Sequence, residues 1–175
     1  MTKERYDWAV DVLIKAYLNG TLFHSECTAC AVGNLCASSI GAEVVVPENY
    51  NRELFIDGPT PEWSIGESAW SNVFLLGTKF PLISLINHND YTEGLRQIAA
   101  TGLTIDELME IEIAFERSNW QFKDEWLEPT TLEEGQYIGL VSVLEAMEKM
   151  VEEDVPHEEN MDRLKSVYEE LVESK

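Results

Sequence analysis

The stretch Leu22–Gly41, LFHSECTACAVGNLCASSIG, constrains the fold most, because it is almost free of charge in a chain full of carboxylates. Most of its residues are small or apolar, and all three cysteines of the chain fall in it. Ser25 belongs to the residue types that cap helices, and Gly41 to those that end them. We therefore predict a helix from about Ser25 to Gly41 at the centre of the core, surrounded by acidic helices. Gly33-Asn34 disfavours a helix by roughly 1 kcal/mol, which indicates tight packing or a local break.

Amphipathic patterns predict further helices on both sides of this stretch. The first begins at the cap residue Thr2 and ends at Asn19-Gly20. Capping boxes, in which a cap residue and an acid three positions later exchange hydrogen bonds, open three more. These predicted helices run from Asp90-x-x-Glu93 to Gly102, from Thr104-x-x-Glu107 to about Ser118, and from Thr131-x-x-Glu134 to about Glu153.

A last helix is predicted after Pro156, and its short connection to the preceding helix predicts an antiparallel hairpin. Gly135 and Gly139 lie one turn apart in that preceding helix, which allows a neighbour to approach closely. The aromatic residues between the helices near Ser118 and Thr131 are expected in a polar loop closed by Pro129. They are Trp120, Phe122 and Trp126.

The segment from Glu43 to Trp63 differs from its surroundings. Val44-Val45-Val46 is β-branched and stops at Pro47, and Glu53–Asp57 is a second short run ended by Gly58-Pro59. β-branched runs between turn residues are typical of strands. A further helix is expected from Ser64 to Leu76. The predicted fold is mainly α, a single compact acidic domain of residues 1–175 with about six helices and room for one small β-hairpin.

The net charge of −21 is the strongest functional signal. Small domains are usually soluble at a net charge of about 2–8 in magnitude. Residues 104–175 carry 21 acids and 6 bases, a net −15, whereas residues 1–103 carry 12 acids and 6 bases, a net −6. This charge argues against direct binding to nucleic acid or an anionic membrane, and it favours a basic protein partner.

Three cysteines packed into ten residues do not form the even-numbered framework of a secreted disulfide protein. MTKERYDW has no apolar core after its charges, so we expect no signal peptide. The most apolar region, Val73–Ile86, is broken by Lys79 and Pro81 and is too short to span a bilayer. We expect a soluble protein of a reducing cytoplasm.

His24, Cys27, Cys30 and Cys36 form an H-x2-C-x2-C-x5-C pattern. Zinc sites use such ligands in a tetrahedron. On a helix, however, Cys36 points roughly 120–180° away from the other two cysteines. We interpret the four as small buried residues without a cofactor. A zinc module and a redox pair at Cys27 and Cys30 stay as alternatives.

Two pairs of carboxylates, Glu107-x-x-Glu110 and Glu145-x-x-Glu148, lie on separate predicted helices. Facing pairs of this kind bind Mg²⁺ in all-helical nucleotide pyrophosphatases. Here both pairs fall outside the apolar stripes, and no pair of basic residues accompanies them to bind phosphates. These two features count against a Mg²⁺-dependent nucleotide hydrolase, which stays as an alternative. The chain has no P-loop, G-x-G-x-x-G, G-x-S-x-G or H-E-x-x-H motif.

Carboxylates at one-turn spacing on a rigid helix pair approach the charge density of DNA, which carries one charge per ~1.7 Å. Such a surface would enter the basic groove of a nucleic-acid-handling protein, although solubility alone also explains it. The predicted partner-binding residues are Glu107, Glu110, Glu116, Glu145, Glu148, Glu152, Glu153, Asp154, Glu158, Glu159 and Asp162.

Four segments carry a resemblance to other proteins. They are CTACAVGNL (27–35), TGLTIDEL (101–108), IEIAFE (111–116) and YIGLVSVL (137–144). Together they resemble a family of short uncharacterised proteins from bacteria and their phages. The family has no known activity, so the resemblance implies no functional residues. A phage setting implies an anti-defence protein such as an anti-CRISPR, encoded by a phage or mobile element and directed against a basic partner such as a CRISPR nuclease.

Overall fold

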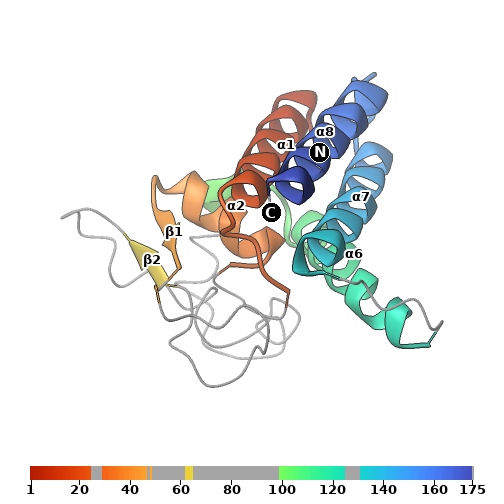
Figure 1. The fold of residues 1–175 in the computed structure, drawn as a ribbon. Coiled ribbons are helices and arrows are strands. Elements are labelled where there is room, and N and C mark those ends of the chain that lie inside the picture. The colour runs from red at the N-terminus through yellow and green to blue at the C-terminus, as the bar shows by residue number, and fades with distance from the viewer. Residues whose placement is uncertain (25–28, 47, 49–61, 65–98, 125–130, 175) are drawn as a thin grey trace.

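The computed structural model describes residues 1–24, 29–46, 48, 62–64, 99–124 and 131–174 (Figure 1). The fold is mainly α, as the sequence predicts. Its described helices are α1 (Lys3–Leu18), α2 (Ala31–Ser39), α6 (Ile105–Asp124), α7 (Leu132–Met150) and α8 (His157–Glu173). Its described strands are β1 (Glu43–Val45) and β2 (Glu62–Ser64). The predicted helix at 64–76 lies outside these ranges apart from Ser64. Of the predicted helix from Asp90 to Gly102, residues 99–101 are described and helical, and Gly102 ends it with φ +69°.

Helix α1 has the predicted bounds. The Thr2 hydroxyl accepts a hydrogen bond from the Arg5 backbone N–H at 3.3 Å, which caps the first turn. Gly20 lies just beyond the helix with φ +67°, a left-handed conformation that glycine adopts without strain. The inward face is fully buried and includes Tyr6, Leu13 and Tyr17.

Helix α2 lies at the centre of the core, as predicted, and residues 31–37 are all buried. The predicted start near Ser25 is wrong, because the helix begins at Ala31. Cys30 is its cap, and the Cys30 Sγ accepts a hydrogen bond from the Gly33 N–H at 3.3 Å. The Asn34 amide donates to the carbonyls of Thr21 and Ala29 at 3.0 and 2.9 Å. These bonds bring Thr21 and Ala29 together ahead of the first turn, which explains the late start.

Strands β1 and β2 pair antiparallel, with Glu43 opposite Ser64 and Val45 opposite Glu62. A small hairpin is therefore present, and its first strand falls where the β-branched run predicts it. The predicted second strand, Glu53–Asp57, lies outside the described residues. The observed partner, Glu62–Ser64, contradicts the prediction that a helix begins at Ser64.

Helix α6 opens with the predicted capping box. The Glu107 carboxylate accepts from the Thr104 N–H at 2.7 Å, and the Glu107 N–H donates to the Thr104 hydroxyl at 3.2 Å. The helix continues to Asp124, so placing Trp120 and Phe122 in a loop is wrong. No glycine or proline between Ser118 and Asp124 interrupts the helix, which explains its length. Trp126 lies outside the described residues.

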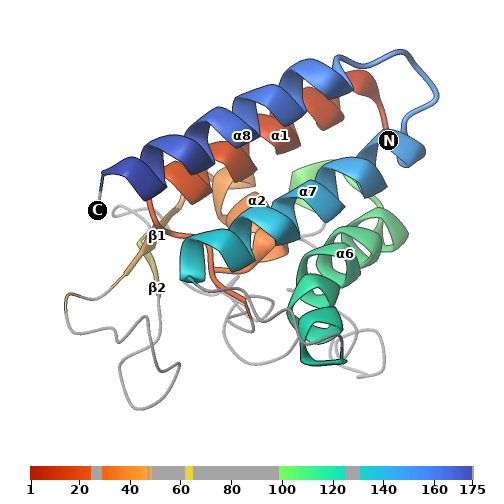
Figure 2. The ribbon, with the colours of Figure 1, turned by 45° about the vertical axis from the view of Figure 1, so that its right-hand side comes forward.

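Helices α7 and α8 form the predicted antiparallel hairpin. Glu148 lies near His157 at one end, and the rings of Tyr137 and Tyr168 stack at the other. Helix α7 begins at its Thr131 cap and ends at Met150, three residues before the predicted Glu153. Helix α8 runs parallel to α1 (Figure 2). The Tyr6 hydroxyl accepts a hydrogen bond from the Asn160 amide.

One hydrophobic cluster contains buried side chains from all five of these helices. Large members include Tyr17 from α1, Leu35 from α2, Phe115 from α6 and Leu144 from α7. Burying each large apolar side chain contributes about 1.5–3 kcal/mol, so this cluster holds the helices in place. Within the described residues, no helix combines the length and the apolar character needed to cross a bilayer.

Candidate functional site

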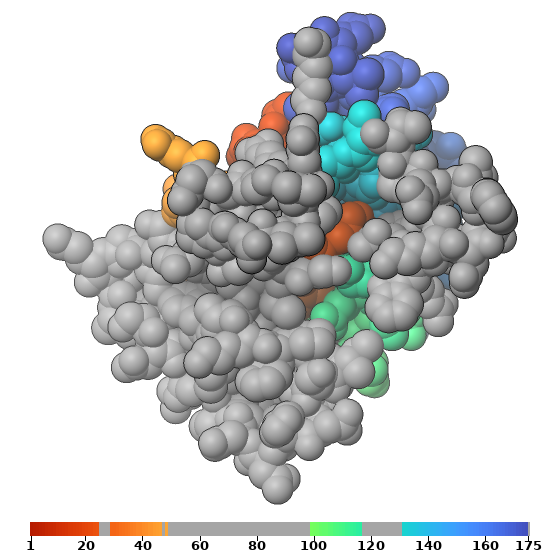
Figure 3. Space-filling view, turned by 60° about the horizontal axis from the view of Figure 1, so that its bottom comes forward, coloured from red at the N-terminus to blue at the C-terminus, as the bar shows by residue number. Residues whose placement is uncertain are grey.

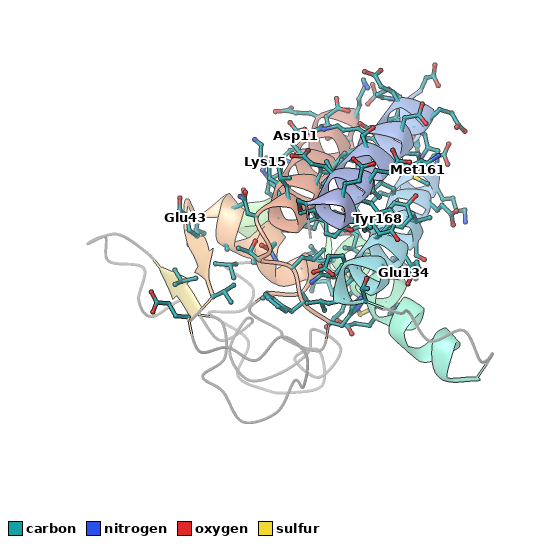
Figure 4. All side chains as sticks on the ribbon, in the orientation of Figure 1. Asp11, Lys15, Glu43, Glu134, Met161 and Tyr168 are labelled. Carbon is teal, nitrogen blue, oxygen red and sulfur yellow. The ribbon has the colours of Figure 1, made fainter. Side chains whose placement is uncertain are left out.

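Eight acidic side chains gather where α7 turns into α8, and we call this surface the acidic tip. All eight are exposed. They come from the last turns of α7, the connection at 151–156 and the first turns of α8, and Lys149 is the only basic residue between Glu145 and Asp162 in the sequence apart from His157. Figure 4 shows oxygen-tipped side chains projecting outward around this end. The tip consists of Glu145, Glu148, Glu152, Glu153, Asp154, Glu158, Glu159 and Asp162.

The carboxylates of the acidic tip have few partners among the described residues; the Glu153 carboxylate accepts a hydrogen bond from the Lys3 backbone N–H at 3.3 Å. Among the described residues, the ion pairs of Lys and Arg side chains use Asp7, Asp11 and Glu169, and none uses a tip carboxylate. Glu148 lies 3.6 Å from the Nε2 of His157. Arg163 adjoins the tip in sequence, but its guanidinium pairs with Asp11 on α1. The tip therefore presents a net anionic surface to solvent.

Helix dipoles act differently on the two sides of the tip. Glu158 and Glu159 lie in the first turn of α8, where the partial positive charge of the helix N-terminus favours carboxylates. Glu145 and Glu148 lie near the C-terminus of α7, where the partial negative charge disfavours them. Helix stability explains the acids on α8 and does not explain those on α7.

Glu107 lies at the same end of the molecule but has a structural role. Its carboxylate pairs with the amino group of Met1, which also donates to the Met150 carbonyl at 2.9 Å. Burial tends to raise the pKa of Glu107, but bonds to the Met1 amino group and to Thr104 outweigh it, and the pKa is lowered. Glu110, one turn later, is exposed. Of the two predicted interface residues on this part of α6, only Glu110 presents its charge outward.

Glu116 lies apart from the acidic tip, beside a buried histidine. The Nδ1 of His24 is 3.8 Å from the Glu116 carboxylate, and the Nε2 is 3.1 Å from the Gly135 carbonyl oxygen. The His24 ring stacks on Phe115 with centroids 4.1 Å apart. A Cβ on Gly139 would lie 2.9 Å from this ring, which explains the glycine that the sequence places in α7. The structure therefore brings ten of the eleven predicted carboxylates toward one end and leaves Glu116 at the buried histidine.

The two described cysteines, Cys30 and Cys36, are buried in the core. Cys30 caps α2, and desolvation followed by the nearby Glu112 charge raises the pKa of Cys36 to about 12. Cys36 is therefore a neutral thiol at physiological pH and a poor nucleophile. Cys27 lies outside the described residues. In the part of the chain that the structure describes, His, Cys, Asp and Glu side chains form no group of three suited to a metal ion.

Within the described residues, the two carboxylate pairs considered for Mg²⁺ form no common group of metal ligands. Glu107 is bound by Met1 and Thr104, whereas Glu145 and Glu148 are exposed on α7. Sequence reasoning missed a different feature, the stacked pair of Tyr137 and Tyr168. Tyr137 lies four residues before Val141 on the same helix face, a spacing that the sequence shows.

Comparisons with known proteins give no further constraint on this site. No protein-family model, curated protein or solved structure matches the chain. The function is therefore inferred from the charge, exposure and contacts of its own side chains.

Proposed function

We propose that this chain is a cytoplasmic, non-enzymatic acidic binding protein that inhibits a basic, nucleic-acid-handling host protein. One observation carries the proposal: eight exposed carboxylates share one end of a helical hairpin, and no lysine or arginine of the described residues pairs with them. Concentrating like charges raises the free energy of the folded state. A basic partner surface would relieve that repulsion on binding.

The acidic tip suits a groove that normally holds nucleic acid. Such grooves place lysine and arginine side chains to match closely spaced phosphates. The tip offers carboxylates from two helices and their connection on a support fixed by the core, so little backbone freedom is lost on binding. Occupying the groove excludes nucleic acid without any chemical step. The expected action is competitive inhibition.

A CRISPR nuclease is one partner with such a groove, because it holds a heteroduplex in a positively charged channel. The resemblance of CTACAVGNL and the three related segments to short bacterial and phage proteins supports an anti-defence role. Phage or mobile-element proteins directed against host nucleases need only block binding. The proposal therefore includes no cofactor and no catalytic residue.

Capture from a lysate of the natural host tests the proposal. The bait proteins are the wild type, a tip variant (Glu145→Lys, Glu148→Lys, Glu152→Lys) and a matched control variant (Glu43→Lys, Glu170→Lys, Glu173→Lys). All six residues are exposed, and both variants change the net charge equally. We expect the wild type and the control to retain a basic nucleic-acid-binding protein that elutes as NaCl rises. The tip variant should retain at least about tenfold less.

The captured protein is then assayed for nucleic-acid binding with and without the wild-type chain. Loss of nucleic-acid binding is the expected result, and it should be reversed by excess nucleic acid. An equal loss of retention in both variants, relative to the wild type, would show that net charge and not the tip determines binding. Retention that does not change with salt would rule out the electrostatic mechanism.

A further inference from the structure

The outer side of the α7–α8 hairpin carries a row of apolar side chains, which we call the tyrosine seam. The rings of Tyr137 on α7 and Tyr168 on α8 stack with centroids 4.5 Å apart. In Figure 4, Met161 and Tyr168 follow one another along α8 beside α7. Figure 3 shows the end of α8 (blue) directly above the start of α7 (cyan). The seam consists of Tyr137, Val141, Met161, Tyr168 and Val172.

The seam is only partly covered by the protein itself. Tyr137, Val141, Met161 and Tyr168 pack against the core but remain partly accessible. Val172, one turn after Tyr168 on the same face, is 47% exposed. Aromatic side chains at a surface are favoured anchors for a partner, because they bury much apolar area and lose little rotamer entropy.

Acidic side chains flank the seam. Glu145 follows Val141 by one turn on α7, and Glu148 continues this line into the acidic tip. Glu169 lies close enough to Tyr137 to help raise the pKa of its hydroxyl, an effect that burial dominates. Exposed Lys165 lies between Met161 and Tyr168 on the same face of α8, where its charge is paired with Glu169. The tyrosine seam, with carboxylates along its edges, is therefore complementary to a partner surface that has an apolar row with cations along its edges.

We infer that the tyrosine seam binds a basic amphipathic helix of the partner protein, an inference that rests on the proposed function. A helix presents aliphatic side chains every three to four residues, in line with the residues of the seam. Lysines and arginines beside those side chains would meet Glu145, Glu148 and the tip. A second copy of this chain fits less well, because a two-fold dimer would bring identical carboxylates together. Nucleic acid is repelled by the same charges.

The probe is a designed helical peptide of about 15 residues, roughly four turns, with leucine on one face and lysine on the other. A second peptide has alanine in place of every leucine and therefore the same charge and length. Binding of each is measured by titration calorimetry over a range of NaCl. We expect the leucine peptide to bind at least about tenfold more tightly, and to retain part of that advantage at high salt.

Three variants separate the contributions. Val172→Gln should remove most of the preference for the leucine peptide and leave the alanine peptide unchanged. Leu18→Gln is the matched control, since Leu18 is 43% exposed on α1, and it should change neither affinity. Glu145→Gln combined with Glu148→Gln should weaken both peptides. Thermal melts of all variants establish that each remains folded.

The outcomes distinguish the two proposals. If both peptides bind equally, and only the glutamate variants weaken them, the seam is not a docking surface while the acidic tip still binds cations. If neither peptide binds at low salt, both proposals fail. If the chain dimerises in sedimentation experiments and Val172→Gln dissolves the dimer, the occupant is a second copy and this inference is overturned.

Discussion

Two glycines with nearly the same backbone conformation differ in their surroundings. Gly102 has φ +69°, and a Cβ there would lie 2.5 Å from the Nε of Arg5. Gly41 has φ +70°, and a Cβ there would meet nothing within 4 Å. An L-residue in this region is strained by roughly 1 kcal/mol in both cases. At Gly102 the Arg5 guanidinium, which lies 5.7 Å from the centroid of the Trp8 ring, must also shift.

We therefore expect Gly102→Ala to lower the free energy of unfolding by about 2 kcal/mol and Gly41→Ala by about 1 kcal/mol. Urea denaturation measures both. In an Arg5→Ala background the cost of Gly102→Ala should fall to that of Gly41→Ala. Equal costs in the wild-type background would mean that the Arg5 contact contributes nothing.

Cys36 allows a prediction with a pH dependence. Burial raises its pKa from 9.0 to about 12, so the folded state retains the thiol proton where the unfolded state loses it. The Cys36 thiol therefore leaves the free energy of unfolding unchanged below pH 9. As the pH rises from 9 towards 12, the unfolded state loses the proton first and the free energy of unfolding falls. Iodoacetamide at about pH 8.5 should label Cys36 only on unfolding, with labelling quantified by peptide mass spectrometry. Rapid labelling of Cys36 in the folded protein would contradict the buried environment.

At the scale of elements, Asn34 fixes how α2 joins the rest of the chain. Its amide donates to the carbonyls of Thr21, Ala29 and Cys30, and its carbonyl oxygen accepts from the Thr21 hydroxyl at 3.2 Å. We expect Asn34→Leu to cost about 3 kcal/mol of stability, because it removes these four side-chain hydrogen bonds and the amide donor to the Thr21 carbonyl. The carbonyls of Ala29 and Cys30 keep backbone N–H donors. Asn34→Asp should cost more. Ser39→Ala, on the same helix, should cost less than about 0.5 kcal/mol in the same chemical denaturation experiment.

The same residue shows where prediction from the sequence reaches its limit. Caps at Thr2, Thr104 and Thr131 located three helix starts correctly, because their partners lie three residues away. The start of α2 depends on bonds from Asn34 back to Thr21, thirteen residues earlier. No local pattern encodes such a contact. The pairing of β1 with β2 across seventeen or more residues was missed for the same reason.

Helix α6 begins with a carboxylate whose ionisation contributes to stability. The pKa of Glu107 is lowered below 4.5, so its contribution is present above that pH and is lost as the pH falls through the lowered value. Glu107→Gln should therefore destabilise the protein at about pH 6 and much less at about pH 3. Glu110→Gln is the control, since Glu110 is exposed one turn later. A difference that does not change with pH would show that the charge of Glu107 does not contribute to stability.

For the whole molecule, composition predicted an anionic protein, and helix periodicity predicted that acids lie outside the apolar stripes. That these acids lie together at one end could not be predicted from periodicity. It depends on the connection between α7 and α8, which brings the last turns of α7 beside the first turns of α8. Glu116 shows the opposite case. It lies on the same helix as Glu107 and Glu110 but faces His24, because α6 is covered there by the chain at Leu22–His24. Periodicity alone does not distinguish these two environments.

The acidic tip leads to a prediction about stability and binding together. Glu145→Gln with Glu152→Gln removes two carboxylates near the C-terminus of α7, where the helix dipole and a net charge of −21 both oppose them. We expect the melting temperature to rise by a few °C at low salt, and the gain to fade in about 0.5 M NaCl. Capture of the basic partner should weaken in the same variant.

Glu158→Gln with Glu159→Gln is the matched control, because it changes the net charge equally at the N-terminus of α8, where the dipole favours acids. This variant should not gain stability, although it should also weaken capture. Thermal melts and the lysate capture assay measure the two effects separately. If the acids on α7 destabilise the fold and yet strengthen capture, their role is to bind the partner. If Glu145→Gln with Glu152→Gln stabilises the protein and leaves capture unchanged, the carboxylates on α7 serve solubility alone.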